Sequence, residues 1–136
     1  APDPCFHRAG ARREHHLERL VASCEIFAPM LPLTPRTAGV IDAALIAALP
    51  RGCLVVQVTR AEICDTEALY RRVAAGELAL AADVFAPEPV PLGSPLLASD
   101  HVVHTPHNAG RTADANRAWA DDVVDRFRPG MPPAGC

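Results

Sequence analysis

The amino-acid sequence predicts an α/β fold built on a doubly wound parallel sheet. Short apolar runs alternate along the chain with segments of helical period, which is typical of strand–helix–strand units. The length of 136 residues, of which 49% are apolar, is enough for one hydrophobic core and short for two. We therefore expect one domain over residues 1–128, followed by an irregular tail over 129–136 that is rich in proline and glycine.

The first half of the chain contains two predicted helices and two predicted strands. A helix around 16–23 places its leucines on one stripe, and the apolar run 25–31, which ends at a proline, predicts a buried strand. Asp42 is a plausible N-cap for a helix over 43–49, because aspartate accepts hydrogen bonds from the free amides of a first helical turn. A second strand is expected over 53–58.

The second half repeats this alternation. A helix over 65–75, with Asp65 as its cap, precedes a strand over 78–84, a proline-rich loop and a short strand over 101–104. A long helix over 112–127 follows. Its apolar residues recur at a spacing of four and form one stripe: Ala115, Trp119, Val123 and Phe127.

Composition and charge exclude several classes of partner. The net charge of −3 and the mixing of basic with acidic residues leave no basic stripe, so we expect no nucleic-acid partner. No apolar run approaches the ~20 residues of a membrane span, and the first residues lack the order of a signal peptide, so we expect no membrane partner and a cytoplasmic location. The five cysteines form no CxxC pair and are expected to be free thiols: Cys5, Cys24, Cys53, Cys64 and Cys136.

Several chemically useful side chains follow the predicted strands directly. Arg60, Asp83 and His107 each lie within three residues of a strand end, Glu88 lies in the loop beyond Asp83, and residues 31–34 leave the preceding strand. Each residue alone is compatible with a purely structural role. Because the carboxyl ends of parallel strands share one edge of a sheet, where ligands bind in such folds, the set together indicates a functional site there.

Three histidines at a spacing of three suggest a metal site as another hypothesis. His101, His104 and His107 could in principle bind one ion. In an extended strand, however, His101 and His104 point to opposite faces, which makes convergence on one ion awkward. We therefore expect no metal.

Four ordered segments carry a specific resemblance. They read LPLTPRTAGVID over 31–42, LPRGCLVVQVTRAEICDTEAL over 49–69, AADVFAPEP over 81–89 and SPLLASDHVVHTPHNAGRT over 94–112. In order and spacing they resemble the D-isomer-specific 2-hydroxyacid dehydrogenases. The resemblance implies a Rossmann-like domain that binds NAD, with NADP possible, and a small 2-hydroxy or 2-keto carboxylate as substrate. It also implies a homodimer.

The resemblance implies a role for each catalytic candidate. Arg60 would bind the substrate carboxylate, because a guanidinium grips a carboxylate through two parallel hydrogen bonds. His107 would take the hydroxyl proton as hydride leaves for the cofactor and would return it in the reductive direction. Glu88 would pair with His107, fix the tautomer of its ring and favour the imidazolium.

The resemblance also implies a set of cofactor-binding residues. Asp83 would hold the nicotinamide carboxamide, and Asp3, in a Pro-Asp-Pro run, would bind the adenosine ribose and favour NAD over NADP. The whole set is Asp3, Leu31, Pro32, Val58, Thr59, Asp83, His107 and Gly110.

The sequence departs from the family pattern in one large respect and several small ones. No GxGxxG occurs, so the first strand–helix unit and the separate substrate domain are expected to be missing from this chain. Ala61 replaces the glycine that usually follows the arginine, Gln57 replaces an asparagine, and Asn108 replaces an apolar residue. An alternative is therefore a non-catalytic protein of the same fold, either degenerate or similar to the corepressors related to this family.

The 136-residue chain by itself should bind NAD weakly. The glycine-rich turn and the helix N-terminus that receive the pyrophosphate are not encoded in it. Calorimetric titration of the chain with NAD tests this expectation, and tight binding would contradict it.

Overall fold

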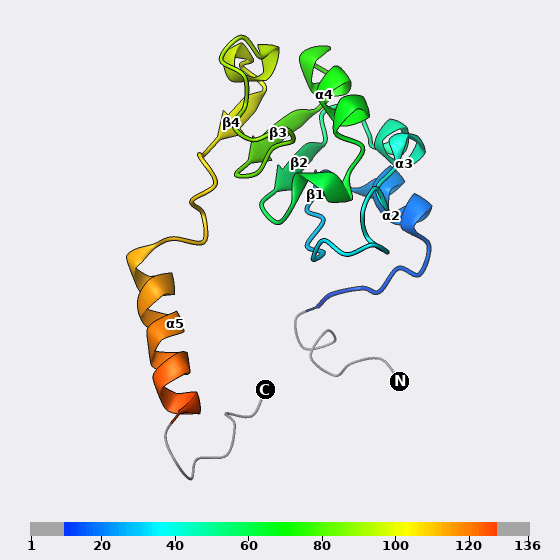
Figure 1. Ribbon diagram of the computed structural model, residues 1–136. Helices are drawn as coiled ribbons and strands as arrows, with labels where there is room; N and C mark the ends of the chain where they lie inside the picture. Colours follow the sequence, from blue (N-terminus) through cyan, green and yellow to red (C-terminus); the bar gives the residue numbers. More distant parts are fainter. Residues whose placement is uncertain (1–9, 128–136) are drawn as a thin grey trace.

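A computed structural model describes residues 10–127 as a parallel α/β structure (Figure 1). Its four strands lie in the spatial order β1-β2-β3-β4 and all neighbouring pairs are parallel. The strands are β1 (Ile26–Phe27), β2 (Leu54–Gln57), β3 (Ala79–Ala82) and β4 (Val102–His104). The predicted fold class is thus confirmed. The predicted ribose-binding Asp3 and the predicted tail over 129–136 lie outside the described residues.

Helices connect the strands, as the alternating pattern predicts. Helices α2, α3 and α4 pack in series, α2 against α3 and α3 against α4. Two short 3-10 helices, η1 and η2, lie in the connections that follow β2 and β3. The elements are α2 (Leu17–Ser23), α3 (Ala43–Ala48), η1 (Ala61–Ile63), α4 (Thr66–Ala74), η2 (Pro95–Ala98) and α5 (Ala113–Arg126). Within 10–127, no helix has both the length and the apolar character needed to cross a membrane.

The predicted helix caps are present. The Asp42 carboxylate accepts a hydrogen bond from the Leu45 amide at 2.9 Å, and the Asp65 carboxylate accepts one from the Ala68 amide at 2.9 Å. These bonds satisfy amides that a first helical turn leaves without partners. Helix α4 is followed by Gly76 at a φ of +67°, a left-handed conformation that glycine adopts without a steric cost.

The core lies between one face of the sheet and helices α2 to α4. Phe27, Val55 and Leu80 are register partners on β1, β2 and β3, so their side chains share that face. All three are buried in one cluster with helical residues such as Ile46 and Leu69. Removal of this apolar surface from water is the main term that stabilises the sheet.

The opposite face of the sheet is poorly covered by the described residues. Ile26 on β1 is 62% exposed and Val103 on β4 is 73% exposed. Val56 and Ala81, which stand in register with Val103 on β2 and β3, are only partly buried. The part of the chain that the structure describes therefore buries only one of the two faces of the sheet.

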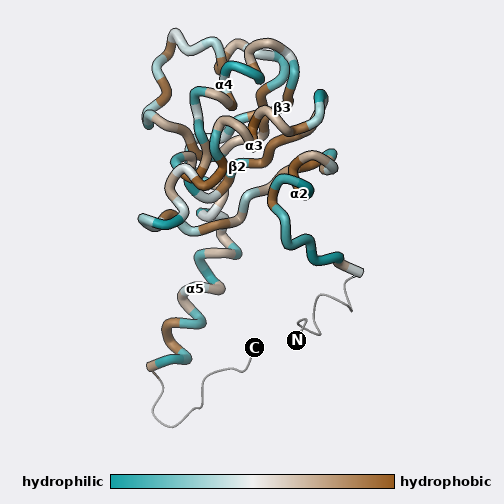
Figure 2. The backbone as a smooth tube through the Cα atoms, turned by 90° about the vertical axis from the view of Figure 1, so that its right-hand side faces the viewer, coloured by the Kyte–Doolittle hydropathy of each residue, from teal (hydrophilic) through white to brown (hydrophobic). Residues whose placement is uncertain are grey.

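Two elements differ from their predicted form. The strand expected over 25–31 is only two residues long, because within residues 10–127 β1 has β2 as its single partner and Pro29 has no amide hydrogen to extend the ladder. Helix α5 forms with Thr112 as its cap, but it extends away from the body of the chain in both views (Figures 1 and 2). Its apolar stripe is consequently not buried, and Phe127 is 83% exposed.

Replacement of the α4 cap should destabilise the domain. We expect Asp65→Ala to lower the free energy of unfolding by about 1 kcal/mol, because the Ala68 amide loses its acceptor. Urea unfolding at pH 7 measures the loss. Asp65→Asn keeps a side-chain oxygen and should lose less, so equal losses in the two variants would argue against the cap.

Candidate active site

The carboxyl ends of the four strands bring together four loops. Residues 28–34 follow β1, Val58 and Thr59 follow β2, Asp83 follows β3, and residues 105–110 follow β4. The Thr59 hydroxyl donates to the Pro29 carbonyl at 3.2 Å and so links the first two loops. This is the edge at which the sequence places the candidate residues.

Asp83 ties the loop after β4 to the end of β3. One carboxylate oxygen accepts hydrogen bonds from the Thr105 hydroxyl at 2.6 Å and from the Asn108 amide at 2.8 Å. The other accepts from the Ala109 amide at 2.9 Å. Burial acts to raise the pKa of Asp83, but these three bonds and the charge of His107 outweigh it and hold the pKa below its usual value.

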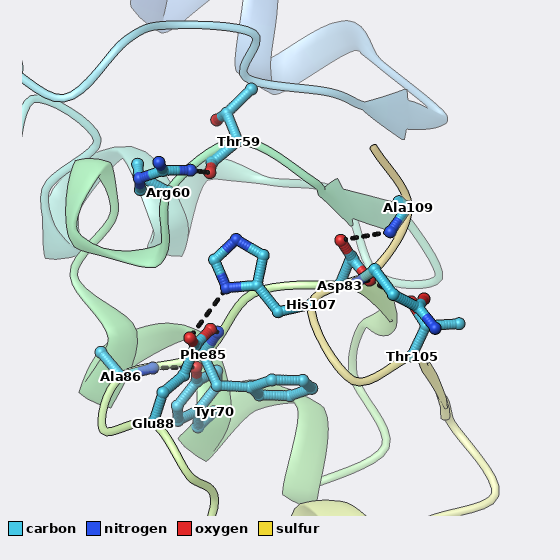
Figure 3. Close-up of polar contacts among 11 residues, drawn as sticks. Thr59, Arg60, Tyr70, Asp83, Phe85, Ala86, Glu88, Thr105, His107 and Ala109 are labelled. Atoms are coloured by element: carbon cyan, nitrogen blue, oxygen red, sulfur yellow. Dashed lines mark hydrogen bonds and ion pairs between the residues drawn. The ribbon is translucent and has the colours of Figure 1, made fainter. Parts of the chain in front are cut away.

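Glu88 and His107 form a close pair (Figure 3). The Nδ1 atom of His107 lies 2.8 Å from Oε2 of Glu88, and the other carboxylate oxygen accepts the Phe85 amide at 2.7 Å. The hydrogen bond with His107 is the largest cause of a lowered pKa of Glu88, followed by the Phe85 amide, against the opposing effect of burial. Arg60 adds a smaller lowering through its charge. Glu88 is therefore a carboxylate that orients the imidazole through Nδ1.

His107 has an unusual backbone conformation. Its φ is +53°, and among residues 10–127 it is the one residue other than glycine with a positive φ. A residue with a side chain pays roughly 1–3 kcal/mol for such a conformation and holds it only where its surroundings enforce it. Here the next two amides, of Asn108 and Ala109, are held by Asp83, and the ring is held by Glu88.

Arg60 lies on the same cavity as the Glu88–His107 pair. A cavity of about 320 Å³ is lined by Arg60, Glu88, His107 and the 3-10 helix residues Ala61 and Glu62, among others. Arg60 is exposed, and one of its terminal nitrogens donates to the Thr59 carbonyl at 2.7 Å. The guanidinium, carboxylate and imidazole predicted from distant parts of the sequence therefore meet at one rim.

The turn that carries Arg60 is held by a buried glutamine. The Nε2 atom of Gln57, a fully buried residue, donates to the Ala61 carbonyl at 3.3 Å. Ala61 is itself buried and has no positive φ, so the alanine that replaces the usual glycine causes no backbone strain.

The same Glu88–His107 pair lines a second cavity. It has a volume of about 480 Å³, and its lining includes Val90, Leu97, His104 and Pro106. His104 stands edge-on to Phe85 with ring centroids 6.2 Å apart. Glu88 and His107 thus line both cavities, and the cavity beside Arg60 has the more polar lining of the two.

Comparison with known proteins decides the family. The model of the D-isomer specific 2-hydroxyacid dehydrogenase NAD-binding domain matches residues 2–109. The chain belongs to this family. The resemblance seen in the four sequence segments is thereby confirmed.

Curated relatives of this 2-hydroxyacid dehydrogenase domain include two kinds of dehydrogenase. The mitochondrial formate dehydrogenase of Solanum tuberosum is 34% identical over 125 residues, which are 89% of this chain and 33% of the relative. The D-3-phosphoglycerate dehydrogenase of Haemophilus influenzae is 34% identical over 122 residues, 86% of this chain and 30% of the relative. The chain thus spans about a third of the length of these relatives.

Solved structures agree with the fold. The apo form of Rhodotorula graminis D-mandelate dehydrogenase matches with a TM-score of 0.81 and 28% identity, over 100% of this chain and 42% of that one. A D-isomer specific 2-hydroxyacid dehydrogenase from Xanthobacter autotrophicus, in complex with NADPH and MES, matches with a TM-score of 0.66 and 39% identity. The match covers 85% of this chain and 49% of the Xanthobacter autotrophicus chain.

The structure places the predicted site residues of the dehydrogenase domain as follows. The candidates Arg60, Glu88 and His107 line one cavity. The predicted cofactor-binding residues within 10–127 all lie on loops at the carboxyl edge: Leu31, Pro32, Val58, Thr59, Asp83, His107 and Gly110. Asp83 already accepts three hydrogen bonds from its own chain, so its proposed bond to a carboxamide stays a prediction.

Sequence reasoning missed three groups that support the site. The Thr105 hydroxyl donates a hydrogen bond to Asp83, and the Phe85 amide donates one to Glu88. The Tyr70 hydroxyl accepts a hydrogen bond from the Ala86 amide at 3.4 Å. Thr105 could have been found, because it opens the Thr-Pro-His motif directly after a strand. The amide of Phe85 and the distant Tyr70 carry no sequence signal.

The hydrogen bonds of Asp83 should make stability depend on pH. Because its folded pKa is lowered, the stabilisation is present above the unfolded pKa of about 3.9 and is lost as the pH falls through the folded pKa. We expect Asp83→Asn to lower the free energy of unfolding by about 2 kcal/mol at pH 6, and the difference from wild type to shrink below pH 4.

Urea unfolding of both proteins across this pH range measures the effect. Asp100→Asn, at an exposed position, serves as the matched control and should change the stability little. A difference between wild type and Asp83→Asn that is the same at pH 6 and pH 3 would contradict the assignment.

Proposed function

We propose that this chain contributes the acid–base pair and the carboxylate-binding arginine to an oxidoreductase that transfers hydride between a nicotinamide cofactor and a D-2-hydroxy acid or 2-keto acid. The observation that carries the proposal is the contact of 2.8 Å between Glu88 and His107 on a cavity that Arg60 also lines. Membership of the 2-hydroxyacid dehydrogenase family supports the same chemistry.

Arg60 suits the recognition of a substrate carboxylate. Among residues 10–127 its side chain donates one hydrogen bond, to the Thr59 carbonyl, which uses one of the five N–H donors of a guanidinium. The side chain is exposed on the cavity and lies toward the same cavity as the His107 ring (Figure 3). A substrate held by its carboxylate on Arg60 would therefore present its 2-hydroxyl or 2-keto group near His107.

His107 suits the proton transfer. Because Nδ1 faces Glu88, the second ring nitrogen, Nε2, is the atom left for the substrate. In the oxidative direction Nε2 takes the hydroxyl proton, and the carboxylate of Glu88 stabilises the imidazolium that forms. In the reductive direction the same nitrogen returns the proton to the new hydroxyl.

The loops at the carboxyl edge suit the nicotinamide end of a cofactor. The nicotinamide ring of NAD, or of NADP, supplies the hydride acceptor when it is bound. Leu31 and Val58 leave apolar surface exposed where two strands end, and the Thr59 hydroxyl and Gly110 lie on the same edge. These residues fit a flat ring with a polar substituent, whereas the sequence contains no GxGxxG turn for the pyrophosphate.

A chimeric enzyme tests the proposal. This segment would replace the matching 122 residues of the Haemophilus influenzae D-3-phosphoglycerate dehydrogenase, and NAD reduction would be followed with a panel of 2-hydroxy acids. We expect His107→Ala to lower kcat by ~10²-fold or more, because the proton acceptor is removed. Glu88→Gln should lower kcat less, because the ring keeps a hydrogen-bond partner.

Arg60 gives a second readout in the same chimera. Arg60→Ala should raise KM for the 2-hydroxy acid strongly. Arg60→Lys keeps the positive charge but cannot donate two parallel hydrogen bonds to the carboxylate, so its KM should lie between those of the wild type and Arg60→Ala. A folded chimera that binds NAD but is unaffected by these substitutions, or that oxidises no 2-hydroxy acid, would favour the non-catalytic alternative.

A further inference from the structure

Two cysteines lie together at the amino ends of β1 and β2, on the opposite edge of the sheet from the candidate active site. Cys24 follows the last residue of α2, and Cys53 directly precedes β2. The residues next to them are joined by a backbone hydrogen bond, from the Leu54 amide to the Glu25 carbonyl, of 2.9 Å. The fold therefore brings two residues 29 positions apart in the sequence to one place.

Both thiols line the same small cavity. The cavity has a volume of about 190 Å³ and is formed by the end of α2 and by the turn before β2, including Arg51 and Gly52. Cys53 is 2% exposed, whereas Cys24 is only partly buried. Cys24 is thus the more accessible of the two cysteines to a small reagent.

Cys24 also affects the ionisation of Cys53. Burial, followed by the charge of Cys24 and a hydrogen bond with the Cys24 thiol, raises the pKa of Cys53 to about 11. The Cys24 thiol donates in addition to the Val21 carbonyl at 3.3 Å, which holds it at the end of α2. Neither residue is used by the proposed dehydrogenase chemistry.

We propose that Cys24 and Cys53 form a dithiol site that reacts with small-molecule disulfides such as oxidised glutathione and closes to an intramolecular disulfide. The Cys24 thiolate attacks one sulfur of the reagent, forms a mixed disulfide and releases one glutathione. Cys53 then loses its proton to solvent and attacks the Cys24 sulfur, which releases the second glutathione. Two protein thiols are oxidised, and one glutathione disulfide is reduced to two thiols.

The third described cysteine provides an internal control. Cys64 is buried at the opposite end of the sheet, after η1, where burial raises its pKa to about 11 and Gln57 opposes the shift. It is buried like Cys53, but within the described part of the chain no second thiol lies against it. It should therefore stay reduced under conditions that close the pair of Cys24 and Cys53.

Peptide mapping of the 136-residue chain tests the proposal. The folded chain is treated with oxidised glutathione at pH 8.5, alkylated and digested. We expect one cross-linked peptide that joins Cys24 to Cys53, two hydrogens lighter than its parts, with Cys64 alkylated. The same treatment in urea should spread the cross-links over other cysteine pairs.

Two variants separate the steps. Cys53→Ala should leave Cys24 as a mixed disulfide with one glutathione, because the neighbouring thiol that would displace it is gone. Cys64→Ser should cross-link like the wild type. Two results with the wild type would overturn the proposal. In one, Cys24 stays glutathionylated beside a free Cys53. In the other, the folded chain forms the Cys24–Cys53 disulfide no more often than the chain in urea does.

The melting temperature gives a readout that does not depend on any variant. A disulfide that closes a loop of about this length without distortion raises the midpoint of a small domain by roughly 5–10 °C. We expect such a rise in the oxidised wild type, reversed by dithiothreitol. A lower midpoint on oxidation would show that the native geometry does not accommodate the bond and would overturn the proposal.

Discussion

The candidate active site depends on the hydrogen bonds that the carboxylate of Asp83 accepts. It stands at the end of β3 and accepts hydrogen bonds from three groups of the loop that follows β4. Two of these are the amides directly after His107, so the bonds hold the residue in its left-handed conformation. A buried carboxylate can do this because each bond to an ionised acceptor is stronger than a bond between neutral groups.

The second constraint comes from the loop between β3 and η2. Glu88 is held through the Phe85 amide on one oxygen and binds the imidazole through the other. His107 is therefore held at two points by the segment that follows β3, through its backbone by Asp83 and through its ring by Glu88. Two such contacts keep the proposed acid–base group in one geometry before a substrate arrives, which is how positioning contributes to catalysis.

The two edges of the sheet carry different chemistry. The carboxyl edge gathers charged groups and two cavities around His107, whereas the amino edge holds the Cys24–Cys53 pair against the core. Between them, one face of the sheet is packed under α2 to α4, and the other leaves Ile26 and Val103 exposed. The described part of the chain is thus a sheet with helices on one face, with the candidate catalytic residues at its carboxyl edge and the cysteine pair at its amino edge.

The sequence by itself determined the order of helices and strands, the aspartate caps of α3 and α4, and the edge of the sheet that Arg60, Glu88 and His107 share, because these follow from local periodicity and from parallel topology. It could not determine the short length of β1 or the exposure of α5, since both depend on which partners lie alongside. Only the tertiary structure decided that Asp83 binds its own loop and that Cys24 meets Cys53. Contacts between residues far apart in the sequence depend on how the helices and strands pack, and the amino-acid pattern within one segment does not specify that packing.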